Sequence, residues 1–272
     1  MRSKINLTLT VVSMAVLVAM MGLISPGLYR DNGFVKAAWY GNDWITLIIV
    51  TPAMLATLYF MKRGVIKARL IWLGLLLYYL YNYAFYLFGA AFNPLFLIYV
   101  GIFSLSLGTL VFGLVDLPVH RFKPVSKSLH FVSVYLVLIA IMLFLVEAIP
   151  AIEYIFFEKV PLIMELTEHP TNIVFALDLS VVMPLSLLAA ILLWRMTIWG
   201  MILATMALVK GIFYGLVLVV STWYIWYNNG ESDPLIPFYL FVVLGGMWGL
   251  WWTMKHTEVL SEEASIRQES GN

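Results

Sequence analysis

The sequence predicts an all-α integral membrane protein built as a bundle of eight transmembrane helices. Of its 272 residues, 62% are hydrophobic and only 11% are charged, whereas a soluble domain carries about 25% charged residues. Eight apolar stretches approach the ~20 residues that a helix needs to cross ~30 Å of hydrocarbon. Lys and Arg residues also concentrate in alternate connections between these stretches, as in proteins that cross a membrane several times.

The expected helices cover about 7–25, 44–61, 68–89, 94–115, 128–149, 172–194, 198–222 and 235–254. The first stretch has a basic start, but its length and the lack of an Ala-x-Ala site favour a retained helix over a cleaved signal. The longest external loop is expected at 148–171. It mixes acids with Ile152, Phe156, Phe157 and Ile163, so we expect it to lie along the membrane surface or cover the bundle. A lid over a site is the alternative.

The orientation follows from the positive residues, because cytoplasmic loops retain Lys and Arg. Of the 16 Lys and Arg residues, Lys210 lies inside a helix and three lie in one set of alternate segments, namely Arg30, Lys36 and Lys159. The other set holds the remaining twelve: Arg2, Lys4, Lys62, Arg63, Lys67, Arg69, Arg121, Lys123, Lys127, Arg195, Lys255 and Arg267. Both termini are therefore expected in the cytoplasm, and the protein in the plasma (inner) membrane of a prokaryote.

Three pairs of short motifs recur in the same order and predict two parallel four-helix repeats, residues 1–127 and 128–272. "NYAFY" in the third helix recurs as "KGIFY" in the seventh, and "NPLFLIY" in the fourth helix recurs as "DPLIPFY" in the eighth. A proline precedes an arginine by eleven residues in both the second and the sixth helix. The matched residues are Asn82 with Lys210, Asn93 with Asp233, and Pro52 with Pro184. Units of four spans insert in one orientation, around an axis along the membrane normal.

Lys210 is the residue that most needs an explanation, because an ammonium at the bilayer centre costs at least ~2.5 kcal/mol. It shares a helix face with Tyr214, and its counterpart Asn82 shares a face with Tyr79 and Tyr86. Tyrosine hydroxyls and an amide are suitable partners for a buried amine. Since burial disfavours the charged form of an amine, Lys210 is also a candidate proton-coupled switch.

Asp178 is the second intramembrane charge, in the sixth helix. A direct contact with Lys210 is doubtful, because the two depths differ by about five residues, or ~7.5 Å in a regular helix. A water or a ligand between them fits the spacing equally well. Glu147, at the outer end of the fifth helix, is interpreted as an interfacial residue.

Enzyme and metal motifs are not found, so no catalytic residue, metal or cofactor is predicted. With no cysteine in the chain, thiolate chemistry is excluded. The four histidines lie in or beside loops on both faces of the membrane and cannot converge on one metal. A net charge of +1 gives no electrostatic footprint for nucleic acid.

The sequence favours recognition or transport of a small solute or ion at a midplane site between the two repeats. The expected ligand-binding residues are Lys210, Asn82, Asp178, Tyr79, Tyr86 and Tyr214. The rival interpretation is a non-catalytic membrane subunit or sensor that acts through lipid, a membrane protein partner or a second copy of itself. In a third interpretation, Lys210 forms a Schiff base with a retinal-like aldehyde.

The orientation can be tested with reporter fusions. A reporter fused after Asn272 should be cytoplasmic, and one inserted near Glu165 should be external, because the positive residues hold their segments inside. Opposite signals would contradict the orientation and the even number of helices.

Overall fold

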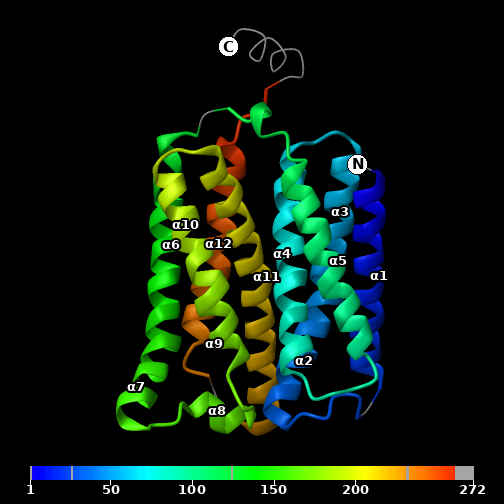
Figure 1. Ribbon diagram of the computed structural model, residues 1–272, viewed down its shortest axis with the longest axis vertical. Coiled ribbons are helices and arrows are strands. Elements are labelled where there is room, and N and C mark those ends of the chain that lie inside the picture. Colours follow the sequence, from blue (N-terminus) through cyan, green and yellow to red (C-terminus); the bar gives the residue numbers. More distant parts are fainter. Residues whose placement is uncertain (1, 26, 124, 231–232, 261–272) are drawn as a thin grey trace.

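The computed structural model describes residues 2–25, 27–123, 125–230 and 233–260, and in these residues eight apolar helical spans form one bundle (Figure 1). Four spans are single helices: α1 (Arg2–Ile24), α4 (Lys67–Gly89), α5 (Phe96–Val115) and α12 (Ile236–His256). A fifth, α11 (Ile198–Asn229), is the longest helix. The eight spans expected from hydropathy are confirmed. Arg267 and Asn272, which enter the orientation argument, lie outside the described residues.

The other three spans change from α-helix to π-helix for five residues. These are α2 (Gly33–Ile45) with α3 (Thr51–Lys62), α6 (His130–Leu143) with α7 (Ile149–Phe157), and α9 (Ile173–Leu177) with α10 (Met183–Trp194). The π segments are Thr46–Val50, Phe144–Ala148 and Asp178–Val182. Each ends two residues before a proline, namely Pro52, Pro150 and Pro184. Because proline lacks an N–H and crowds the preceding turn, the wider π turn lets the helix continue past it.

The helices of the two halves of the chain lie on two sides of the bundle, and α4 packs against α11 between them (Figure 1). The α4–α11 contact is close because Gly74 faces Val209. A Cβ atom on Gly74 would lie 2.5 Å from the Cβ of Val209. Small residues permit such an approach between membrane helices, where packing replaces the hydrophobic effect.

The turn after the second span recurs 132 residues later with the same backbone hydrogen bonds. The Arg63 N–H donates to the Tyr59 carbonyl at 3.2 Å, and the Arg195 N–H donates to the Ile191 carbonyl at 3.0 Å. The residues that follow both have positive φ angles: 80° at Gly64 and 57° at Met196. The sequence motif around Pro52 and Pro184 thus extends to a shared turn geometry.

The fourth and eighth spans begin with the same side-chain turn, 140 residues apart. Asn93 Oδ1 accepts a hydrogen bond from the Leu95 N–H at 3.0 Å, and Asp233 Oδ1 accepts one from the Leu235 N–H at 2.8 Å. Asn and Asp commonly stabilise the start of a helix in this way. This explains why the two "NPL" and "DPL" motifs hold a short polar residue at the same place.

The two halves are also joined at the end of the bundle where α1 begins and α12 ends, called here the terminal face. The connection between α5 and α6 pairs with the segment after α12 through a β-bridge between Phe122 and Val259. Beside it, Lys123 Nζ lies 2.6 Å from a carboxylate oxygen of Glu258. This hydrogen bond and the charge of Lys123 lower the pKa of the Glu258 carboxyl.

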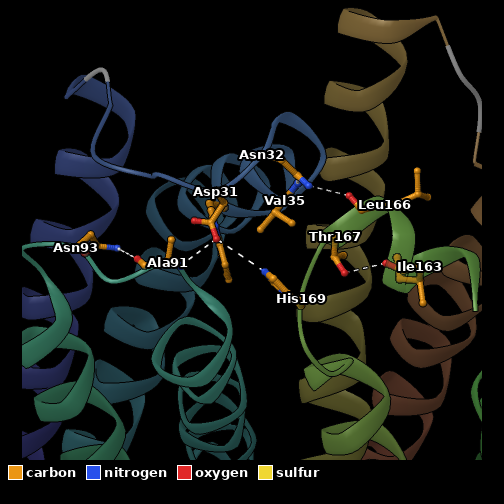
Figure 2. Close-up of polar contacts among 10 residues, drawn as sticks. Asp31, Asn32, Val35, Ala91, Asn93, Ile163, Leu166, Thr167 and His169 are labelled. Carbon is orange, nitrogen blue, oxygen red and sulfur yellow. Dashed lines mark hydrogen bonds and ion pairs between the residues drawn. The ribbon is translucent and has the colours of Figure 1, made fainter. Parts of the chain in front are cut away.

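At the opposite end of the bundle, the segment expected as a loop at 148–171 is partly helical. The fifth span continues through α7 to Phe157, so its helix ends later than the expected 149. The short helix α8 (Leu162–Thr167) then lies over α2 (Figure 2), where Asn32 Nδ2 donates to the Leu166 carbonyl at 2.9 Å. The segment covers this end of the bundle, as expected, and Phe156 and Phe157 are largely exposed.

The ion pair at the terminal face gives a pH-dependent prediction. A carboxyl whose pKa is lowered by folding adds stability above its unfolded pKa, about 4.3 for glutamate. That contribution is lost as the pH falls through the lower folded-state pKa. We expect Glu258→Gln to lower the melting temperature slightly near pH 7, and the difference to vanish towards about pH 3. A difference that stays constant over this range in thermal unfolding would contradict the ion pair.

Candidate functional site

A cavity of about 560 Å³ is lined mainly by the second half of the chain. Its second-half walls come from α6 to α12 and from the π segments at Phe144–Ala148 and Asp178–Val182. The first half contributes a smaller part of the wall through Phe34, Val35, Ala38 and Phe85. Most lining residues are apolar, and the charged residues and His169 among them fall into three groups.

The first polar group contains Lys210, which is 5% exposed and therefore lies inside the bundle. Its Nζ lies 3.4 Å from Oδ1 of Asp178, so the two form a buried ion pair. The doubt raised by their depths was wrong for two reasons. Asp178 begins a π segment, whose extra residue per turn shortens the helix along its axis. Lysine also has a long flexible side chain that spans the remaining offset.

Two tyrosine rings complete the surroundings of the Lys210 amine. Its Nζ lies 3.5 Å from the centroid of the Tyr81 ring and 4.7 Å from that of Tyr214. The rings meet edge to face, with centroids 4.7 Å apart. A cation over an aromatic face gains about 2 kcal/mol when water is excluded. The rings and Asp178 together offset part of the desolvation of the ammonium.

Glu147 is the third member of this group, and its interpretation as an interfacial residue is corrected. It is only 4% exposed, because the fifth span continues past Pro150 and leaves Glu147 inside the bundle. Its carboxyl interacts with Asp178 and is attracted electrostatically by Lys210. Its Oε2 atom is buried and has no hydrogen-bond partner among the described residues. We call Glu147, Asp178 and Lys210 the charged cluster.

A second polar group, around Asp233, stabilises the start of α12. Asp233 Oδ2 accepts hydrogen bonds from the Tyr239 hydroxyl at 3.0 Å and from Thr222 Oγ1 at 3.4 Å. Its other oxygen caps the Leu235 N–H. All these residues line the cavity. Because both carboxylate oxygens have donors within the protein, this aspartate has a structural role.

The third polar group belongs to the segment that covers the end of the bundle opposite the terminal face. His169 lines the cavity, and its Nε2 lies 3.8 Å from Oδ1 of Asp31 (Figure 2). Asp31 is fixed by the Ala91 N–H at 2.9 Å and by the Trp39 indole N–H at 3.0 Å. The segment at 148–171, called here the covering segment, therefore makes two polar contacts with the described residues of the first half of the chain. They are the His169–Asp31 contact and the hydrogen bond from Asn32 to the Leu166 carbonyl.

The predicted binding residues of the first half lie elsewhere. Lys210, Asp178 and Tyr214 line the cavity, whereas Asn82, Tyr79 and Tyr86 are not among its lining residues. Both polar atoms of the Asn82 amide are buried without a hydrogen-bond partner among the described residues. The structure thus brings together three of the six predicted residues.

Asp43 is a buried acid that the sequence did not single out. It is 2% exposed and accepts hydrogen bonds from the Tyr29 hydroxyl at 2.6 Å and the Tyr86 hydroxyl at 2.9 Å. The expected second helix began at Trp44, which left Asp43 in a loop, whereas α2 already begins at Gly33. The capping residue Asn32, whose side chain accepts from the Val35 N–H, was the available signal.

The ion pair gives a test in which stability is measured. Lys210→Met removes the amine and leaves two buried carboxyl groups without a cation, so we expect a loss of about 3 kcal/mol. Adding Asp178→Leu replaces both partners by apolar groups and should restore most of that stability. Thermal unfolding of the purified variants checks this. If Lys210→Met alone is as stable as the unchanged protein, the ion pair contributes nothing to the fold.

Comparisons with protein-family models, with curated proteins and with solved structures found no match to this chain.

Proposed function

We propose that the protein binds a small solute in the second-half cavity and carries it across the membrane. The observation that carries the proposal is the position of the charged cluster, which forms part of the wall of a cavity of about 560 Å³. Ligand sites are typically concave spaces of about 300–1,000 Å³, mostly apolar, with a few polar groups that orient the ligand. The cavity matches this description in size and in the character of its wall.

The alternative is that the polar residues only fix how the helices pack. Charged residues inside a membrane are costly and face either one another or a cavity. A pair that only sets helix register needs no space beside it, since close packing around the pair stabilises both. Lys210, Asp178 and Glu147 all border the same open space. This favours a binding site over a packing contact.

We also propose that residues 1–127 and 128–272 are two parallel four-helix repeats, of which only the second keeps a charged site. The shared turns and π segments at offsets of 132 and 140 residues support this. At these offsets Asp178 corresponds to Thr46, and Lys210 corresponds to Asn82 at an offset of 128. Both charges are therefore replaced by neutral residues in the first half. Under this proposal the site lies within the second repeat, against α2 and α4.

The covering segment is the part of the structure best suited to control access. Leu162, Leu166 and His169 line the cavity from this segment. Its polar contacts with the first half are the His169–Asp31 contact and the Asn32–Leu166 hydrogen bond (Figure 2). Lids that close over a solute are commonly held by few such contacts, which lets them open on a microsecond to millisecond scale.

A cavity-filling substitution tests the proposal against a matched control. Gly211 lines the cavity, and a Cβ atom there would meet only Val242 at an ordinary 3.6 Å, so Gly211→Leu should fill space without strain. Gly108 in α5 is also helical, has nothing within 4 Å of its Cβ position and does not line the cavity. Gly108→Leu is therefore the control.

The purified variants are screened by thermal unfolding against amines, neutral alcohols and carboxylates. A solute present at 100 times its Kd stabilises a protein by about 2.7 kcal/mol. We expect at least one solute to stabilise the unchanged protein and Gly108→Leu but not Gly211→Leu, and to cross proteoliposomes only with the first two. If no solute distinguishes the two variants, the protein is better explained as a membrane subunit or sensor.

A further inference from the structure

The charged cluster holds two carboxyl groups and one amine, so one carboxyl group has no cation of its own. Four charged residues line the cavity: Glu147, Asp178, Lys210 and Asp233. Lys210 balances Asp178 at 3.4 Å, and Asp233 has donors for both of its oxygens. Glu147 forms no ion pair among the described residues, and its Oε2 atom is buried without a partner. A buried carboxylate oxygen in this state requires a donor or a cation.

Lys210 does not supply that donor in the structure. Its Nζ is directed to Asp178 and lies over the face of Tyr81, with Tyr214 on another side. Glu147 is placed on a different element, the π segment Phe144–Ala148, with the cavity beside it. Glu147 lines the cavity from that element, so a positive group in the cavity has no need to displace the Lys210–Asp178 pair.

The rest of the cavity wall suits an apolar body. Around the charged cluster it carries aromatic and aliphatic side chains that include Phe175, Phe238 and Val242. A volume of about 560 Å³ far exceeds the ~30 Å³ share of one water molecule, so a bare monovalent ion would leave most of it unfilled. Aromatic faces also attract organic cations.

We propose that the solute is a small organic cation, with an apolar or aromatic body and a single positive charge that pairs with Glu147. This inference rests on the proposed function, because it names the class of solute for the same cavity. Binding forms one ion pair between the solute and Glu147 and leaves the Lys210–Asp178 pair intact. No covalent step is involved.

Three probes of nearly equal shape separate charge from size. Benzyltrimethylammonium is cationic, neopentylbenzene is its neutral carbon analogue, and phenylmethanesulfonate is anionic. Binding of each is measured by calorimetry and thermal unfolding on the purified full chain. We expect the cation to bind at least tenfold more tightly than the neutral probe, and the sulfonate not to bind.

Glu147→Gln removes the charge at constant shape, and we expect it to weaken binding of the cation at least tenfold. Binding of the neutral probe should be unchanged, which shows that the cavity is intact in the variant. The control is Glu153→Gln, in the same span, where the glutamate pairs with Lys159 and does not line the cavity. This control should leave binding of the cation unchanged.

The outcomes separate the two proposals. Equal or tighter binding of the neutral probe or the sulfonate, or binding of the cation that survives Glu147→Gln, overturns the cationic solute and leaves the proposed function standing. Equal or tighter binding of the neutral probe would follow if a proton shared by Glu147 and Asp178 satisfies Oε2 of Glu147. If none of the three probes binds the unchanged protein, the cationic solute is refuted. The comparison of Gly211→Leu with Gly108→Leu then tests the proposed function separately. If Glu147→Gln fails to fold, the charge series on the unchanged protein still decides.

Discussion

The burial of Lys210 between membrane-spanning helices is the constraint on which the rest of the second half depends. An ammonium at this depth must be paired, because neither lipid nor an apolar helix face replaces its hydration. Asp178 meets it at 3.4 Å, and the π segment that begins at Asp178 gives the helix the geometry for this contact. Tyr81 and Tyr214 lie beside the pair, and Glu147 interacts with Asp178. Glu147, Asp178, Lys210 and Tyr214 all line the cavity.

The first half of the bundle also buries polar groups, Asn82 and Asp43 among them. The Asn82 amide has no hydrogen-bond partner among the described residues, and the buried carboxyl of Asp43 accepts hydrogen bonds from two tyrosine hydroxyls rather than pairing with a cation. Hydrogen bonds to a carboxyl group are among the stronger polar contacts in a protein interior. The two halves therefore share helix breaks and turns but differ in electrostatics. This difference explains why the charged cluster lines a cavity mainly in the second half.

Hydropathy was sufficient to predict the eight spans, because the requirement for ~20 apolar residues leaves few alternatives. The side chains that form the site were harder to predict. Glu147 was expected at the outer end of the fifth helix, whereas a π turn lets the helix continue to Phe157. Asp43 was missed because an amphipathic turn precedes the apolar part of α2. The cavity depends on how side chains from helices of both halves of the chain pack, and no local pattern encodes that.

The central claim is that the second-half cavity admits a water-soluble molecule, and cysteine accessibility tests it most directly. The chain contains no cysteine, so a single introduced thiol is the only target. Ala207 lines the cavity, whereas Ala204, one turn away on α11, is fully buried outside it. The account predicts that a small water-soluble methanethiosulfonate labels Ala207→Cys in intact membranes and leaves Ala204→Cys unlabelled. Equal labelling of both variants, or of neither, would contradict it.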